Sequence, residues 1–140
     1  MDKKKYIILI ITIIIFITII AVILINSNNK TNWIEKVKAS DTYQINISNC
    51  NSKEITVPNE TIDEIAKKLD NISDNGPWTG DNNKCYTTLT ISYNNDDKIE
   101  YITIKIIDDN SFTLSTNGSD RYYTNSKELN TYINNLLNEY

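Results

Sequence analysis

The feature that most constrains this chain is an uninterrupted apolar stretch close to its N-terminus. Residues 6–25 carry no charge, and Tyr6, Thr12 and Thr18 are the polar interruptions. A helix of about 20 apolar residues spans the hydrocarbon core of a bilayer, which is roughly 30 Å thick. Isoleucine dominates the stretch and is a poor helix former in water, but in lipid the backbone must satisfy its hydrogen bonds within the segment. We therefore expect residues 6–25 to form a transmembrane helix.

A cleaved signal peptide is the alternative for this segment. The apolar region of a signal peptide is about 7–15 residues long and is followed by a cleavage site of small residues. Here the stretch is longer, residues 25–29 are Ile-Asn-Ser-Asn-Asn, and no cysteine lies near its end to carry a lipid. These features favour an uncleaved anchor.

The charges that flank the stretch predict its orientation. Three lysines at residues 3–5 precede it, whereas Lys30 alone follows it closely. Positive charge stays on the cytoplasmic side, so we expect a single-pass protein of the cell membrane with a cytoplasmic N-terminus and an extracytoplasmic domain. The expected division is a basic tail at 1–5, the transmembrane helix at 6–25, a juxtamembrane tether at 26–40 and a domain at 41–140.

The part expected outside the membrane is acidic. Residues 26–140 contain 11 Lys and Arg against 17 Asp and Glu, a formal charge of −6. Phosphates of nucleic acids and anionic lipid headgroups repel such a domain, so nucleic acid is excluded as a partner. The abundance of Asn, Ile and Lys is typical of an AT-rich genome, such as that of a low-GC Gram-positive bacterium.

Strands are predicted wherever apolar and polar residues alternate. Tyr43, Ile45 and Ile47 alternate with polar neighbours, which is typical of a half-buried strand. The later strands are rich in Thr, Ile and Tyr, residues that favour extended structure. The expected strands are 41–48, 54–57, 85–93, 99–107, 111–116 and 120–124, with a loop over 73–84 and an Asn117-Gly118 turn before the last strand.

Two segments of the domain carry apolar residues at intervals of three and four, which predicts helices. The first covers residues 59–72 with Asn59 as its N-cap, and the second runs from Asn125 or Ser126 to the C-terminus, with Glu128 placed to complete a capping box on Asn125. We expect these two helices to pack on one face of a mostly antiparallel sheet built on a four-strand meander, which is an α+β domain.

A short helical pattern also occurs in the tether. Trp33, Ile34 and Val37 fall at helical spacing. Trp33 lies close enough to the span to sit in the membrane interface or to cover the edge of the domain. We favour packing against the domain, because Glu35 is poorly placed among anionic headgroups.

Cys50 and Cys85 are the two cysteines. An even number of cysteines outside the membrane favours a disulfide. Closing this loop would contribute about 4 kcal/mol in the chain-entropy model. Two reduced thiols are the alternative.

The residue types that most enzymes require are missing. The chain has no histidine, so it lacks the commonest general base and metal ligand, and two isolated cysteines do not make a zinc site. The acidic pairs Asp96/Asp97 and Asp108/Asp109 fall in expected turns, where aspartate is favoured for turn geometry. We therefore expect no enzymatic activity, no cofactor and no metal.

Aromatic residues suggest a binding surface. Trp78 lies between turn formers, and Tyr122 and Tyr123 are adjacent in a strand, so one ring must point away from the core. Trp78, Arg121 and Tyr122 could together form an exposed patch for a protein, peptide or glycan ligand. The alternative for Trp78 is a lid over the end of the core.

Three segments carry a resemblance to a known group. They are the alternating strand Tyr43-Gln44-Ile45-Asn46-Ile47, the Val57-Pro58 entry to an Ile-rich helix, and Asp120-Arg121-Tyr122-Tyr123 before the terminal helix. With these, residues 41–140 resemble small extracytoplasmic domains of unknown function from Firmicutes, which are often lipoproteins. The chain departs from them in having an apolar helix where a lipid-bearing cysteine would be expected. The resemblance implies a fold and a location, and no activity.

The sequence therefore predicts a membrane-anchored, non-enzymatic extracytoplasmic binding or accessory module. The alternative is a small subunit of a membrane complex that acts through its transmembrane helix, with Thr12 and Thr18 bonding across helices.

Overall fold

The computed structural model describes residues 3–29, 31–116 and 118–140. Residues 1, 2, 30 and 117 lie outside this description, and with them parts of the expected tail and tether and Asn117 of the expected Asn117-Gly118 turn. The chain forms two compact units, residues 1–32 and 33–140. The elements, in chain order, are α1 Lys3–Asn29, α2 Asn32–Ala39, β1 Tyr43–Ser48, β2 Glu54–Val57, α3 Thr61–Lys68, β3 Ser73–Pro77, β4 Thr88–Asn95, β5 Lys98–Asp108, β6 Ser111–Thr116, β7 Ser119–Thr124 and α4 Lys127–Glu139.

The first unit is the helix α1, and it contains the expected span. Its stretch Lys3–Val22 is long and apolar enough to cross a membrane, and none of this stretch is buried within the protein. Thr12 donates its hydroxyl hydrogen bond to the carbonyl of Ile8 at 2.9 Å, and Thr18 does the same to Ile14 at 2.8 Å. Both threonines are thereby satisfied within their own helix.

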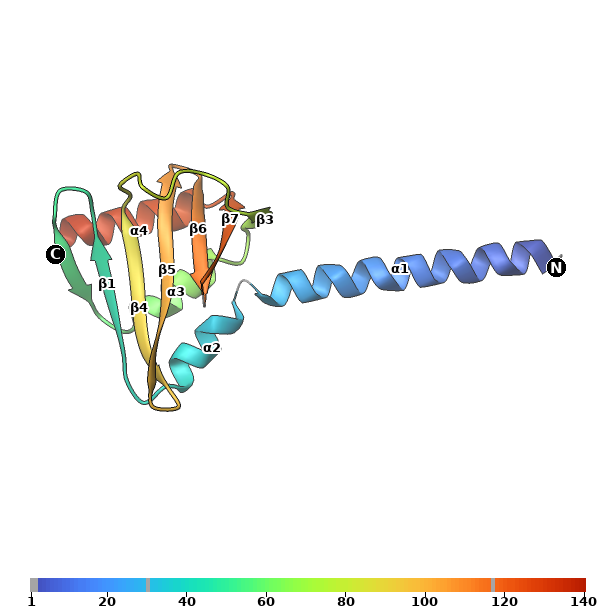
Figure 1. Ribbon diagram of the computed structural model, residues 1–140, viewed down its shortest axis with the longest axis horizontal. Helices are drawn as coiled ribbons and strands as arrows, with labels where there is room; N and C mark the ends of the chain where they lie inside the picture. Colours follow the sequence, from blue (N-terminus) through green and yellow to red (C-terminus); the bar gives the residue numbers. More distant parts are fainter. Residues whose placement is uncertain (1–2, 30, 117) are drawn as a thin grey trace. The chain divides into compact units, whose positions relative to one another are not determined.

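The second unit contains a seven-stranded antiparallel sheet in the order β2-β1-β4-β5-β6-β7-β3, in the part of the chain that the structure describes (Figure 1). The expected meander of four strands is present as β4 to β7, but it is only the centre of the sheet. The β1–β2 hairpin pairs beside β4, and β3, which lies in the expected loop 73–84, pairs beside β7. The sheet therefore has seven strands, and the prediction of a sheet built on a four-strand meander was too small.

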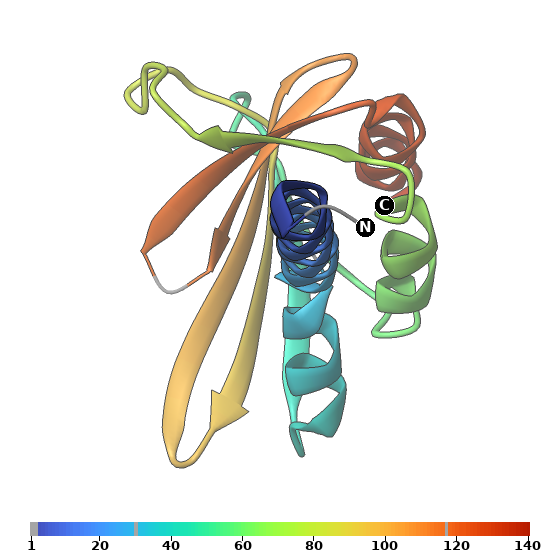
Figure 2. The ribbon, with the colours of Figure 1, turned by 90° about the vertical axis from the view of Figure 1, so that its right-hand side faces the viewer.

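Within the described residues of this second unit, three helices, α2, α3 and α4, cover one face of the sheet, and the opposite face carries none of them (Figure 2). The covered face is built from every second residue of the strands. Ile47, Leu89, Ile104 and Leu114 lie opposite one another on neighbouring strands, and each is almost fully buried. The helices contribute a matching set of buried residues, namely Trp33, Ile34, Val37, Ile62, Ile65, Leu129, Ile133, Leu136 and Leu137.

The helices differ from the predictions in where they begin and in which residues cap them. Trp33 is 4% exposed and packs in the core, so α2 is part of the compact domain. The helix α3 begins at Thr61 after Glu60 and ends at Lys68, so Asn59 does not cap it. The capping box expected at α4 does not form either, because the N-cap is Ser126, which makes no side-chain cap bond. The Asn125 side-chain amide donates to the Ser73 hydroxyl at 2.8 Å.

Both acidic pairs lie in turns, as expected. Asp96 and Asp97 have φ of 47° and 63°, the left-handed geometry at both central positions of a type I′ hairpin turn between β4 and β5. The Asp108 carboxylate accepts the backbone N–H of Asn110 at 2.9 Å, which fixes the turn between β5 and β6. The neighbouring Ser111 and then this backbone N–H lower the pKa of Asp108.

Candidate functional site

The candidate site lies on the side of the sheet that no helix of the second unit covers. We call it the open face. Its side chains alternate with the buried ones along the same strands, so they point away from the helices. The open face is formed by Gln44, Asn46, Thr56, Thr90, Ser92, Ile99, Tyr101, Thr103 and Ser115.

A continuous polar row crosses the open face. Thr56, Asn46, Thr90, Thr103, Ser115 and Asp120 stand opposite one another on six successive strands. With strands about 4.8 Å apart, the row is roughly 24 Å long. Its β2 end is bonded internally, since the Thr56 hydroxyl donates to the Asn46 side-chain oxygen at 2.9 Å. Within the described ranges, the hydroxyls of Thr90, Thr103 and Ser115 make no such internal bond.

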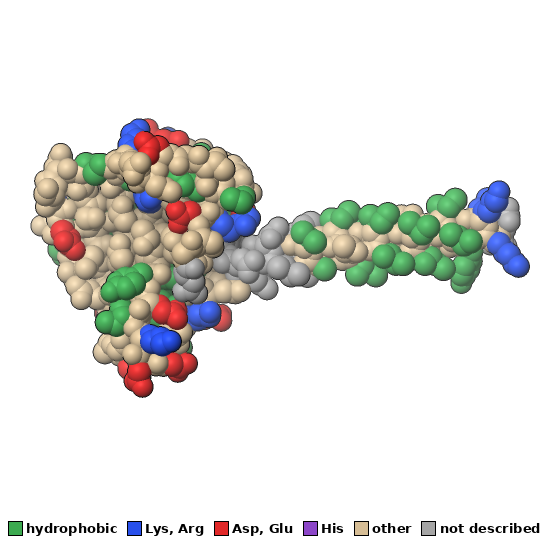
Figure 3. Space-filling model, viewed as in Figure 1, with side chains coloured by type: hydrophobic (Ala, Val, Ile, Leu, Met, Phe, Trp, Pro, Cys, Tyr) green, Lys and Arg blue, Asp and Glu red, His purple; other side chains and the backbone are tan. Residues whose placement is uncertain are grey.

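Two exposed side chains stand at the end of the open face near the β4–β5 turn. Ile99 is 62% exposed and Tyr101 is 57% exposed, whereas Ile102 and Ile104 on the same strand are buried. A depression of about 260 Å³ lies beside Ile99 and is lined also by Thr42, Gln44 and Ser92. The view in Figure 3 shows this side of the domain as mostly polar with a small apolar patch near its lower end.

The other end of the open face is covered by residues 78–87, which connect β3 to β4. We call them the crossing segment (Figure 1). Trp78 begins it, with its backbone N–H donating to the carbonyl of Asp120 at 3.0 Å and its ring 5.3 Å from that of Tyr122. Thr113, which faces the same side as Tyr122, is only 2% exposed. The segment therefore hides part of the sheet.

Trp78 is packed on several sides rather than presented to solvent. Its indole N–H donates to the side-chain oxygen of Asn82 at 3.1 Å. Gly80 lies so close to the six-membered ring that a Cβ added there would be 2.0 Å from Cζ2. The position supports a role in anchoring the crossing segment, and Trp78 lies over the open face rather than over the helix-covered core.

A tyrosine and a lysine hold the middle of the crossing segment. The Tyr86 hydroxyl donates to the carbonyl of Asp81 at 2.9 Å. The Lys105 ammonium lies 5.6 Å from the centre of the Tyr86 ring and 3.5 Å from the Asn82 side-chain oxygen. These contacts are on the surface and contribute little individually.

Arg121 does not join the aromatic patch expected from the sequence. Because residues alternate along β7, Tyr122 faces Trp78 while Arg121 faces the helix-covered side. There it forms two 2.9 Å hydrogen bonds with the Asp74 carboxylate, which raises the pKa of Arg121. The structure thus brings together Trp78 and Tyr122 and places Arg121 on the opposite face, where it ties β3 to β7.

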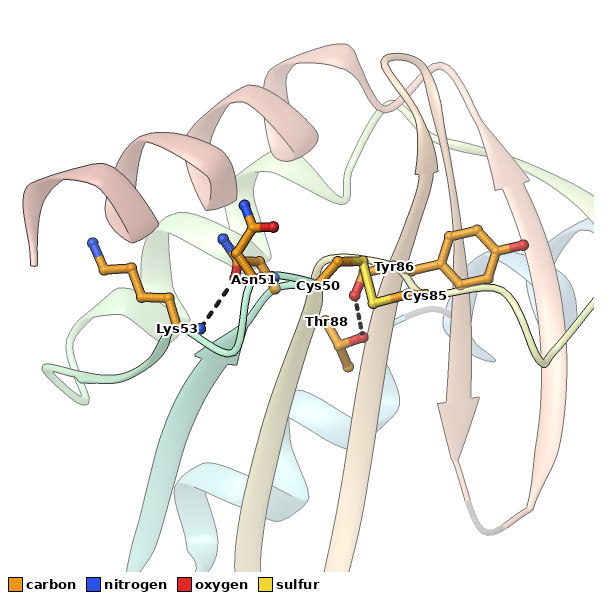
Figure 4. Close-up of a disulfide and its surroundings, with 7 residues drawn as sticks. Cys50, Asn51, Lys53, Cys85, Tyr86 and Thr88 are labelled. Atoms are coloured by element: carbon orange, nitrogen blue, oxygen red, sulfur yellow. Dashed lines mark hydrogen bonds between the residues drawn. A yellow bond between two sulfur atoms is a disulfide. The ribbon is translucent and has the colours of Figure 1, made fainter.

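The cysteines predicted to pair lie at disulfide distance. Cys50 follows β1 and Cys85 precedes β4, with their Cα atoms 5.6 Å apart and their sulfur atoms joined (Figure 4). Both residues are exposed. The bond therefore ties the end of the crossing segment to the β1–β2 turn.

A tyrosine–carboxylate pair with shifted pKa values lies on the helix side of the sheet. The Tyr93 hydroxyl donates to the Glu100 carboxylate at 2.6 Å. Burial, and then this hydrogen bond, raise the pKa of Tyr93 to about 12, while the same hydrogen bond lowers the pKa of Glu100. The pair joins β4 to β5 on the helix-covered side of the sheet, and it does not face the open side.

Among residues 3–29, 31–116 and 118–140, no group of three or more Cys, Asp or Glu could hold a metal ion. Ile99, Tyr101 and Thr103 were not singled out from the sequence, although their alternation with buried Ile102 and Ile104 carried the signal.

Comparisons of the chain with models of protein families, with curated proteins and with solved structures gave no match. The resemblance to extracytoplasmic domains of Firmicutes stays an expectation from the sequence.

Proposed function

We propose that the chain is a single-pass membrane protein whose N-terminus is cytoplasmic and whose extracytoplasmic domain is a non-enzymatic binding module. The apolar helix α1 and the lysines at residues 3–5 support the anchor and its direction. The paired Cys50 and Cys85 fit a domain on the oxidising side of the membrane.

The observation that carries the binding role is the asymmetry of the sheet. One face is closed by three helices, whereas the open face exposes Ile99 and Tyr101 among polar side chains. Tyrosine is enriched at protein interfaces, and Lys, Glu and Asp are depleted. Tyr101 is exposed at the end of the open face near the β4–β5 turn, so we propose that a protein or peptide partner docks there with Tyr101 as an anchor.

The alternative, a subunit that acts through its membrane helix, has less support. Thr12 and Thr18 already bond within α1, so they do not require a neighbouring helix. Replacing residues 6–25 by an unrelated apolar helix separates the two functions, because a module that binds through the open face retains its partner and a helix-dependent subunit loses it.

The direct test is photo-cross-linking of the full-length chain in cell membranes. A photoreactive phenylalanine analogue replaces Tyr101 in one variant and Tyr140, which is 59% exposed, in a matched control. We expect one defined adduct from position 101 and none from position 140. Equal labelling from both positions, or no adduct from position 101, would contradict the proposal.

A further inference from the structure

The Cys50–Cys85 bond is attached to the crossing segment, because Cys85 is one of its residues. Backbone hydrogen bonds fix the segment to the sheet at its two ends, while its middle makes only surface side-chain contacts. In the part of the chain that the structure describes, the main-chain hydrogen bonds that tie it to the sheet are Trp78 N–H to Asp120 at one end and Ile106 N–H to Thr87 at the other. Residues 79–85 between them are exposed. Segments with few buried contacts and few backbone bonds open at low free-energy cost.

The disulfide is the covalent tie of this segment. Cys85 lies next to Tyr86, whose ring contacts Lys105, and close to Thr88, whose hydroxyl donates to the carbonyl of Tyr86 at 3.4 Å (Figure 4). Neither cysteine belongs to the hydrophobic core. The bond therefore holds the crossing segment against the sheet without contributing to the packing beneath the helices.

We infer that the Cys50–Cys85 bond is a site of reversible thiol–disulfide exchange with a dithiol, and that its reduction frees the crossing segment and enlarges the open face. This inference rests on the proposed function in that the face it enlarges is the proposed binding surface. The part uncovered is the row of Lys105, Thr113 and Tyr122, which adjoins the polar row already exposed.

The chemistry balances with a dithiol as the reductant. One of its thiolates attacks a sulfur of the pair and forms a mixed disulfide, and the other cysteine leaves as a thiolate that takes up a proton. The second thiol of the reductant then attacks the mixed disulfide. Two electrons and two protons pass to Cys50 and Cys85, and the dithiol becomes a disulfide. Exposure of both cysteines gives the reductant access.

Tryptophan fluorescence of the full-length chain in detergent micelles tests the inference. The protein has two tryptophans, so Trp33→Phe leaves Trp78 as the reporter and Trp78→Phe leaves buried Trp33 as the matched control. With dithiothreitol, we expect acrylamide quenching of Trp78 to rise about twofold, quenching of Trp33 to stay constant and the circular dichroism spectrum to persist. A Cys50→Ser/Cys85→Ser variant should show the raised quenching without dithiothreitol.

Limited trypsin digestion of the unaltered chain gives a second measurement that needs no variant. Lys84 lies in the crossing segment and is exposed, so reduction should accelerate cleavage after Lys84 and leave cleavage after Lys127, at the start of α4, unchanged. Unchanged Trp78 quenching and unchanged Lys84 cleavage would overturn the inference, as would loss of the whole fold on reduction. If position 101 still cross-links its partner in that case, the proposed function stands and only the redox control is wrong.

Discussion

The same strands form both faces of the sheet, but one face is buried beneath helices and the other is largely exposed to solvent. On β5, Ile102 and Ile104 are 2% and 0% exposed, while Tyr101, directly before Ile102, is 57% exposed. Adjacent residues of one strand therefore point to opposite faces, one into the core and the next toward solvent. The difference teaches that substitutions on one face should change stability, and substitutions on the other should change binding.

The largest expected effect comes from a substitution that leaves a cavity in the core beneath the covered face. Ile104→Ala removes a fully buried side chain at the centre of the sheet and should lower the free energy of unfolding by about 2–5 kcal/mol. Thr103→Ala, one residue away on the open face, should cost less than about 1 kcal/mol. Denaturant unfolding of the full chain, followed by tryptophan fluorescence, measures both. Equal costs would show that the two faces are not separate.

A smaller effect should separate the two sides of β7. Asp74→Ala breaks the paired hydrogen bonds to Arg121, and we expect a loss of about 1 kcal/mol, because the Arg121 side chain is 42% exposed and solvent screens the pair. Asp120→Ala, on the open side, should change the free energy of unfolding by less than about 0.5 kcal/mol. Denaturant unfolding measures both variants. A larger loss of unfolding free energy for Asp120→Ala than for Asp74→Ala would contradict the assignment of faces.

The next comparison is a dependence on pH. The pKa of Glu100 is lowered in the fold, so its contribution is present above its ordinary pKa and is lost as the pH falls through the folded value. The pKa of Tyr93 is raised from 10.0 to about 12, so its contribution is present below pH 10 and is lost as the pH rises toward 12.

Tyr93→Phe should therefore flatten both limbs of a plot of unfolding midpoint against pH. Tyr101→Phe, on the open face, should leave the plot unchanged. A profile that Tyr101→Phe alters and Tyr93→Phe does not would reverse the two assignments.

The smallest effect on stability should accompany the largest effect on binding. Tyr101→Ala should change the free energy of unfolding by less than about 0.5 kcal/mol, because its ring is exposed. It should weaken the binding of the partner cross-linked at this position by about tenfold or more, as loss of an aromatic anchor does. Titration of that partner against the two proteins in membranes checks this, and unchanged affinity would remove Tyr101 from the binding surface.

The regular parts of the fold could be predicted because their patterns are local. Tyr43, Ile45 and Ile47 defined β1 by alternation, and helical spacing defined α3 and α4. The strand β3 could not be found in this way, since Ser73-Asp74-Asn75-Gly76-Pro77 alternates no apolar residues. It is held instead by pairing with β7 and by side-chain bonds such as Asn75 to Thr124.

The candidate site was predicted less well than the fold. Trp78 and Tyr122 do meet, but Arg121 was grouped with them although its neighbour Tyr122 must face the other way. The open face itself depends on which strands pair and on which side the helices lie. Both are set by contacts distant in sequence, such as the pairing of β1 with β4, and no local pattern contains them.

The two outermost strands of the sheet affect whether copies of the domain aggregate when they are at high density. An unprotected sheet edge invites the edge of a second sheet and leads to aggregation. Here β2 is four residues long and is ended by Pro58, while β3 includes Pro77 and an irregularity in its pairing between Asp74 and Pro77. Short, kinked edges of this kind are poor templates for strand addition. Domains at high density can therefore stay separate and soluble, with their broad faces, and not their edges, available for contact.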